Sequence, residues 1–203
     1  MSQQNILIVD GTTGQVVEAH LCEPITDDHV RDTQEKWKPW EANAITTSAS
    51  PLVEQSAHWD WEWKLQEFGG QIAFPTFAIE CDGDTQGLLI TSTTESCRLP
   101  AQRGMSLIYV EYLVTAPWNR QTLTASPRYT AVGSVLMSVA FQLSFDEAYD
   151  CNGRVGLYSL PQSSKWYAEK CGMTDLGIDP HKPPLSYFET TTDQAKAFLA
   201  RGA

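Results

Sequence analysis

The segment between residues 106 and 160 restricts the fold of this chain more than any other part of the sequence. Residues 106–116 (SLIYVEYLVTA) form an almost continuous apolar run, typical of a strand that is buried on both faces of a sheet. Residues 154–160 predict a second strand, and a helix is expected between them, from Ala131 to about Tyr149. That helix has one apolar stripe at helical spacing, made of Val132, Val135, Leu136, Val139, Ala140 and Leu143. The order strand, helix, strand predicts a right-handed βαβ unit.

The flanking segments predict mainly antiparallel strands before this unit and alternating helices and strands after it. The strands expected before it form two hairpins, over 5–10 with 15–21 and over 74–81 with 86–93. Two helices are expected between the hairpins, over 27–37 and over 51–68, the second with Ser50 as N-cap and Pro51 in its first turn. After the unit we expect a helix over 161–171, a strand over 185–191 and a helix over 193–201. The 203 residues are therefore predicted to form one α/β domain.

Charge and composition exclude several classes of function. A formal net charge of -11 argues against a broad nucleic-acid-binding surface. No apolar run approaches the length of a membrane span, and the N-terminus lacks a basic start followed by a long apolar core, so we expect a cytoplasmic protein. The five cysteines are widely separated, without a CxxC pair or a Cys/His cluster at metal-ligand spacing, so no metal is expected and a reducing compartment is favoured.

One stretch combines positive charge with a helix start. Residues 96–145 contain a single acid, Glu111, and four basic residues, which are Arg98, Arg103, Arg120 and Arg128. Within this stretch, SPRYTAVGSVLMSVAF (residues 126–141) places Arg128, small residues and Gly133 directly before the predicted helix. The first amides of a helix have no partner within it and carry partial positive charge, which makes them an anion site. The segment is neither a Walker loop nor a G-x-G-x-x-G fingerprint.

The same segment resembles the pyrophosphate loop of the GNAT superfamily of N-acetyltransferases, Q/R-x-x-G-x-G/A. Arg128 and Gly133 match the pattern, and Ala131 stands where the first glycine usually occurs. The preceding strand YVEYLVTAPWNR, the following strand RVGLYSL and the segment SSKWYAEKCGM keep the order and spacing of the family. The resemblance covers about residues 72–190. The loop between Arg120 and Arg128 is longer than in the simplest members, and the first 70 residues match no motif.

This resemblance implies a mixed, mostly antiparallel central sheet with helices on both faces and with the strands 106–116 and 154–160 splayed apart. It implies that residues of about 1–95 form the acceptor side and that about 105–173 form the core that binds acetyl-CoA. The pantetheine is expected along Leu113, Val114 and Thr115. The pyrophosphate is expected on the amides of Tyr129, Thr130, Ala131, Val132, Gly133 and Ser134, with Arg128 beside them.

Two side chains are candidates for proton transfer. Tyr167 occupies the position where the family often places the acid that protonates the leaving thiolate, and a phenol suits this because its pKa, about 10, is close to that of a thiol. The alternative is an aromatic residue packed beside Trp166. Glu111 lies alone in an apolar strand, where burial would raise its pKa toward that of a general base, unless a neighbouring arginine pairs with it. His58, Asp60 and Glu62 are weaker candidates for the base.

The sequence therefore predicts an enzyme that transfers an acetyl group from acetyl-CoA to a small-molecule or peptide amine. A longer acyl chain, or a non-catalytic module that binds acyl-CoA or a protein partner, remain alternatives. Residues 27–67 contain nine acids and four bases, which predicts an acidic rim that attracts cationic acceptors. In that region a helix would bury Trp61 and leave Trp59 and Trp63 opposite. Met137, Phe141 and Phe145 form a second stripe on the helix from 131, covered by another layer or by a second copy in a homodimer.

Overall fold

The computed structural model describes residues 2–47 and 54–202, which form two compact units. The first unit contains Met1–Ile90 and Leu113–Leu136, and the second contains Thr91–Tyr112 and Met137–Ala203. Three elements contribute residues to both units: strand β4 (Asp84–Ser92), strand β5 (Ile108–Thr115) and helix α4 (Val132–Ser144). The two units are described in turn.

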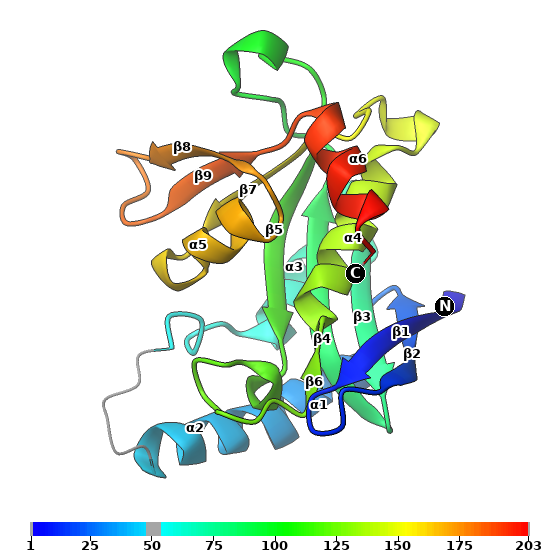
Figure 1. Ribbon diagram of the computed structural model, residues 1–203, viewed down its shortest axis with the longest axis vertical. Helices are drawn as coiled ribbons and strands as arrows, with labels where there is room; N and C mark the ends of the chain where they lie inside the picture. The colour runs from blue at the N-terminus through cyan, green and yellow to red at the C-terminus, as the bar shows by residue number, and fades with distance from the viewer. Residues whose placement is uncertain (1, 48–53, 203) are drawn as a thin grey trace. The chain divides into compact units, whose positions relative to one another are not determined.

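The strands of the first unit are antiparallel. Strands β1 (Ser2–Asp10) and β2 (Val16–Glu23) form a hairpin, β3 (Thr76–Cys81) pairs with both β2 and β4, and the two-residue strand β6 (Tyr129–Thr130) adds to the outer edge of β1 (Figure 1). Eight of the nine residues of β4 are buried, because both faces of this strand are covered. The two predicted hairpins are confirmed, whereas β6 was not predicted.

One helix of the first unit ends later than predicted, and another begins later. Helix α1 (Asp27–Asp32) continues through a π-helical turn, Thr33–Trp37, into α2 (Lys38–Thr47), so the predicted end at Trp37 is wrong. The wide turn lies directly before Pro39, where the proline ring would otherwise clash with a carbonyl four residues earlier. Helix α3 covers only Trp61–Phe68 and is capped by Asp60, whose Oδ1 accepts the Trp63 amide at 3.1 Å. The predicted caps at positions 50 and 51 lie outside the described residues.

The second unit contains the parallel strand pair. Strand β5 pairs in parallel with β7 (Val155–Ser159), and β9 (Ser186–Glu189) joins β7 to the edge strand β8 (Thr174–Ile178) by antiparallel pairing. Helix α5 (Pro161–Glu169) packs on β7 and β9 (Figure 1). Strand β8 was not predicted, because four of its five residues are exposed and no apolar alternation marks it.

The apolar stripes of α4 are buried as the periodicity predicted. Met137 and Phe141 are 0% exposed, and the Phe141 ring lies 4.9 Å from that of Phe198 on helix α6 (Thr192–Ala200). Met137 and Phe141 of the second stripe are therefore covered within the chain, whereas Phe145 is half-buried. Helix α4 ends at Ser144, five residues before the predicted end, and the chain continues into one of three short 3₁₀ turns, which are Pro100–Gln102, Pro117–Asn119 and Glu147–Tyr149.

These elements confirm the predicted fold class, a mixed and mostly antiparallel sheet with helices and one parallel βαβ crossover. All five cysteines are buried thiols. In the described part of the chain, every helix is too short or too polar to cross a bilayer.

Candidate active site

The parallel ladder between β5 and β7 opens after three residue pairs. Its last pair is Val110 with Leu157, although β5 continues to Thr115 and β7 to Ser159. The last residues of β7, Tyr158 and Ser159, pair only with β9, along the opposite edge of the strand. Backbone groups of β5 beyond Val110 therefore lack β7 as a partner, which is the predicted divergence of the two strands. In open α/β sheets, ligands bind beyond the carboxyl ends of diverging parallel strands.

In the first unit, the start of α4 meets the last residues of β5. A β-carbon placed on Gly87 would lie 2.9 Å from the Val132 side chain and 3.2 Å from the Val114 carbonyl oxygen, so glycine at 87 allows this close packing. The first helical hydrogen bond of α4 runs from the Val135 amide to the Ala131 carbonyl at 2.9 Å. The amides of Val132 and Gly133 precede it and so have no acceptor inside the helix.

Ala131 adopts a backbone conformation that favours glycine. Its φ is +68°, in the left-handed region, at the position where the GNAT pattern has its first glycine. The loop thus takes the conformation that a glycine would give it, in spite of the substitution.

Not all of the predicted amides face outward. Tyr129 and Thr130 form β6 and pair with Asp10 and Val9 of β1, and the Tyr129 amide donates to Asn119 Oδ1 at 2.8 Å. The hydrogen bonds of the helix start therefore favour Val132 and Gly133 over Tyr129 as donors to an anion. The prediction for Ser134 stays open, because its side chain or backbone has another interaction in the structure.

The Arg128 side chain is held by acids. Its Nη1 lies 2.7 Å from Asp84 Oδ2 and its Nη2 lies 3.6 Å from Asp82 Oδ2, while Lys36 Nζ lies 2.7 Å from the other oxygen of Asp84. Burial acts to raise the pKa of Asp84, but the hydrogen bonds from Lys36 and Arg128 outweigh it and lower that pKa. These residues line a cavity of about 500 Å³, formed by Lys36, Trp40, Asp84, Trp118, Ser126 and Arg128.

A buried cluster of charges, not predicted from the sequence, holds the end of β5. Arg120 Nε donates to the Thr115 carbonyl at 2.7 Å, and its Nη1 lies 2.9 Å from Glu41 and 3.5 Å from Glu54. Burial raises the pKa of Glu41, Arg120 lowers it and Glu54 raises it. The carbonyl of Thr115 therefore already accepts a hydrogen bond from Arg120, and the expected pairing of a pantetheine with Leu113, Val114 and Thr115 stays a prediction.

Glu111 is half-buried on β5 in the second unit. Burial raises the pKa of its carboxyl group, the nearby Glu95 raises it further, and Lys182 opposes both. In the described part of the chain Glu111 forms no ion pair within 4 Å, so the predicted alternative, a pairing that would lower its pKa, does not occur.

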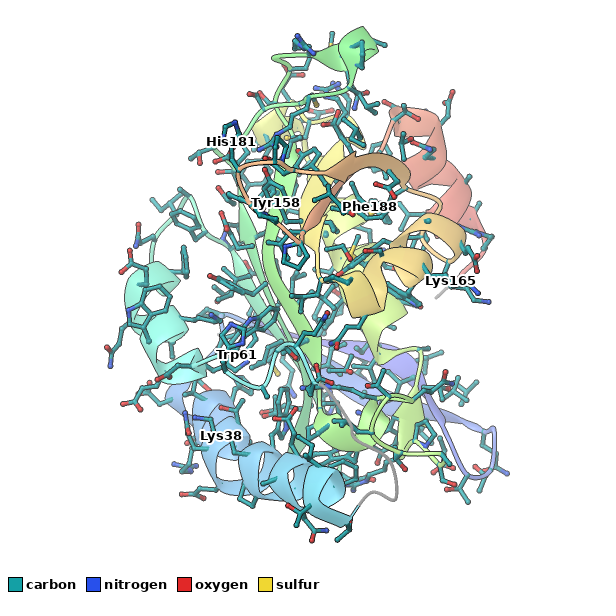
Figure 2. All side chains as sticks on the ribbon, turned by 90° about the vertical axis from the view of Figure 1, so that its left-hand side faces the viewer. Lys38, Trp61, Tyr158, Lys165, His181 and Phe188 are labelled. Carbon is teal, nitrogen blue, oxygen red and sulfur yellow. The ribbon has the colours of Figure 1, made fainter. Side chains whose placement is uncertain are left out.

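Tyr167 is buried, with 7% of its surface exposed. Its ring lies 5.0 Å from Trp166 and 6.0 Å from Phe188, which Figure 2 labels. Burial, and to a lesser extent Cys171, raises the pKa of its phenol, so the hydroxyl keeps its proton. Of the weaker candidates, Asp60 caps α3 and both His58 and Glu62 are exposed.

Within the described residues, one group of His, Cys and acidic side chains is close enough to share a cation. It contains Cys22, His29 and Glu80, with ligand atoms within 4.8 Å of one another. His29 Nδ1 accepts the Thr26 amide at 2.9 Å, so in the neutral ring the proton is on Nε2, which faces Glu80 at 2.8 Å. A nitrogen that carries a proton cannot bind a metal, and metal-binding histidines donate with the other nitrogen. The donor set does not fit a metal.

No protein-family model and no curated protein sequence matches the chain. Solved structures do. An uncharacterized protein from Bacillus halodurans superposes with a TM-score of 0.60 at 12% identity, covering 97% of this chain and 94% of that one. FeeM, an N-acyl amino acid synthase from uncultured soil microbes, gives 0.54 at 10%, covering 91% and 98%. The GNAT domain of S. lividans PAT gives 0.51 at 12%, covering 93% and 96%. The chain has the GNAT fold.

Proposed function

We propose that this protein is an acyltransferase that moves an acetyl group from acetyl-CoA to the nitrogen of an amine. The opened ladder between β5 and β7 carries the proposal. It leaves an extended stretch of β5 unpaired with β7, and β5 leads into a loop that ends at the helix start of Val132 and Gly133. Coenzyme A is an extended amide chain with a pyrophosphate at one end. Its chain could pair with the open part of β5, and its pyrophosphate could bind at the helix start.

The acyl donor supplies a thioester, whose carbon–sulfur bond breaks as the carbon–nitrogen bond forms. An ammonium acceptor must lose two protons, and one of them ends on the departing thiol while the other reaches solvent. Glu111 would take the first proton, because its raised pKa brings it closer to that of an amine. The Tyr167 hydroxyl, which keeps its proton, would donate that proton to the departing thiolate. The chain itself forms no covalent bond in this scheme, and its contribution is orientation and proton transfer.

The length of the acyl chain is a second question. One solved structure with this fold is an N-acyl amino acid synthase, so a longer acyl group is a candidate donor. A non-catalytic acyl-CoA-binding module is the other alternative, and it predicts binding without turnover. Comparing acetyl-, hexanoyl- and dodecanoyl-CoA as donors at equal concentration separates these possibilities.

The binding step can be tested without knowing the acceptor. Coenzyme A is expected to raise the Tm of the protein, because a ligand that binds only the folded state stabilises it. Gly133→Val should abolish this shift, since the added side chain blocks the approach of a pyrophosphate to the backbone. Ala197→Val, at an exposed alanine on α6, serves as the control and should retain the shift. An undiminished shift in Gly133→Val would contradict the assignment of the loop.

A further inference from the structure

Three tyrosines form a row across one face of the sheet in the second unit. Tyr109 of β5 pairs with Gly156 of β7, and two residues further along β7 Tyr158 pairs with Tyr187 of β9. The ring of Tyr158 lies 6.4 Å from that of Tyr109 and 5.1 Å from that of Tyr187. A β-carbon on Gly156 would lie 2.5 Å from the Tyr187 hydroxyl, so glycine at this position leaves space for the rings.

Two cations lie on this tyrosine row. The Arg98 guanidinium carbon is 4.0 Å from the centre of the Tyr187 ring and 5.0 Å from that of Tyr158, and Lys182 Nζ is 4.4 Å from Tyr158. Arg98 Nη1 also binds the Tyr158 hydroxyl at 2.6 Å and Asp179 at 3.2 Å. Lys182 has no carboxylate within 4 Å among the residues that the structure describes. At least one of the two cations is therefore available to an anion.

The backbone that carries Arg98 is fixed by a buried carboxylate. Glu189 is 0% exposed and accepts the amides of Arg98 at 2.7 Å and Leu99 at 3.1 Å, together with the Gln102 side chain at 2.8 Å. A carboxylate with three donors is well satisfied in the interior. Arg98 thus extends from a rigid segment rather than from a mobile loop.

Lys182 is also placed by its loop. Residues 179–185 (DPHKPPL) contain three prolines, whose rings fix φ, and the loop closes through hydrogen bonds from the Lys182 amide to Asp179 and from the Asp179 amide to Leu185, both 3.0 Å. Figure 2 labels His181 of this loop close to Tyr158.

Carboxylates lie at the other end of the same face. Glu111 is two residues from Tyr109 on β5, so both side chains point to the same side of the sheet. Glu95 is close enough to Glu111 to influence its ionisation, and so is Lys182. Among the described residues, the face therefore presents two unpaired acids, Glu111 and Glu95, together with Lys182 and the Arg98–Asp179 pair, in an arrangement that complements a zwitterion.

We propose that this face binds an acceptor that carries its own carboxylate, such as an amino acid, with the ammonium toward Glu111 and the carboxylate on Lys182 and Arg98. The proposal rests on the acyl transfer proposed above and specifies its acceptor. A polyamine would place cations against Lys182 and Arg98, and a simple amine would leave both cations without a partner.

The test compares three amines of similar shape: leucine, leucinamide and 3-methylbutylamine. The ratio of kcat/KM between Lys182→Gln and the wild type is measured for each, so that the basicity of each amine cancels. We expect about a tenfold or greater loss for leucine, the usual effect of losing a charge-assisted hydrogen bond, and little change for the other two. Lys182→Glu should lower the rate with leucine further. Lys196→Gln, an exposed lysine on α6, is the matched control and should change none of the three.

Two outcomes overturn the proposal about the acceptor. One is equal turnover of the three amines by the wild type, and the other is an equal effect of Lys182→Gln on all three. If no amine is acetylated, the proposed acyl transfer fails instead, and binding of the same amines, measured by isothermal titration calorimetry, then tests whether the face selects a carboxylate. Selective binding of leucine that is lost in Lys182→Gln supports the proposal, and equal binding of all three contradicts it.

Discussion

Burial has opposite chemical consequences for the two side chains proposed to move protons. It raises the pKa of both the Glu111 carboxyl and the Tyr167 phenol. A raised pKa makes a carboxylate a stronger base, whereas it makes a phenol a weaker acid that keeps its proton until a thiolate develops beside it. Burial thus prepares a base at Glu111 and a donor at Tyr167.

For Glu111 we predict a change in the pH profile as well as in rate. A base works only when deprotonated, so wild-type kcat/KM should fall as the pH falls through the raised pKa. Glu111→Gln should lower kcat by about 10²- to 10³-fold and remove that acid limb. The measurement is kcat/KM between pH 5 and pH 9, with coenzyme A affinity as the control. An intact acid limb in the variant would assign the base to another group.

For Tyr167 the prediction separates chemistry from packing. Tyr167→Phe keeps the ring against Phe188 and removes only the hydroxyl. If Tyr167 is the proton donor, the variant should lose about 10²-fold in kcat. Its Tm and its affinity for coenzyme A should stay close to those of the wild type. Unchanged turnover would show that the residue is part of the core, the alternative that its 7% exposure also fits.

Lys64 gives a prediction about stability. It is 5% exposed beside the rings of Trp59 and Trp63, and burial lowers its pKa from 10.5 to about 8, although Asp60 opposes this. Between these two pH values the unfolded chain binds a proton that the folded protein does not, so the free energy of unfolding should rise with pH through this window. Lys64→Met should remove that rise and increase stability at pH 7 by on the order of 2 kcal/mol. Urea unfolding at pH 7, 8.5 and 10 measures both effects, and a variant less stable at pH 7 would contradict them.

At the scale of elements, the loop before α4 shows what a residue pattern can and cannot establish. The pattern located the loop, and the structure adds that Ala131 takes a positive φ and that the Tyr129 amide is used by Asn119. Neither fact can be read from local sequence. The positive φ of Ala131 is expected only by comparison with loops that have glycine there, and the acceptor of the Tyr129 amide is a side chain ten residues away. The same limit explains why the Arg120 cluster was missed, since its acids, Glu41 and Glu54, come from segments more than 60 residues earlier.

Element types were predicted better than element ends. Strong apolar periodicity predicted β5, α4 and β7, because burial on a sheet imposes it. The edge strand β8 and the two-residue β6 bury too few side chains to leave a pattern. The end of the first helix was misplaced at Trp37, because the π-helical turn that accommodates Pro39 has no sequence signature.

The conformation of Ala131 can be tested by a substitution toward the family pattern. A non-glycine residue in the left-handed region costs about 1–2 kcal/mol, and glycine removes that cost while losing part of it to the entropy of the unfolded chain. Ala131→Gly should therefore raise the free energy of unfolding by about 0.5–1 kcal/mol. The control, Ala197→Gly in the middle of α6, should lower it by about 1 kcal/mol. Equal losses in both variants, measured by urea denaturation, would show that position 131 does not hold this conformation in solution.

At the scale of the whole molecule, the net charge counted from the sequence overstates the negative electrostatic potential that a ligand meets at the acidic region. The acidic region 27–67 has a net charge of -5 by sequence, yet Asp28 pairs with Arg31 at 2.6 Å, Asp32 with Lys36 at 2.7 Å, and Glu41 and Glu54 with Arg120. Arg120 comes from outside the region, so it neutralises part of that charge. The predicted attraction of cationic acceptors by this region stays a prediction, and its salt dependence should be weak.

All five thiols of the chain are shielded at once, which predicts how the folded protein reacts with a thiol reagent. None of the cysteines is more than 5% exposed, and burial is the main cause that raises the pKa of Cys22 and Cys151 to about 11 and of Cys97 and Cys171 to about 12. Since the thiolate is the reactive form, an aromatic disulfide dye should modify the native protein only as fast as it opens. Rapid release of one or more equivalents of dye from the native protein would contradict this.

The same shielding gives the protein a built-in reporter. Each acyl transfer releases one molecule of coenzyme A, whose thiol is in solution and colours the dye at once, while the enzyme contributes no background. Catalysis can therefore be followed continuously in the cuvette, with any amine and without a label. When the enzyme is finally denatured in the same cuvette, five further equivalents of colour per chain should appear, so that a single optical trace records the turnover and then counts the enzyme that performed it.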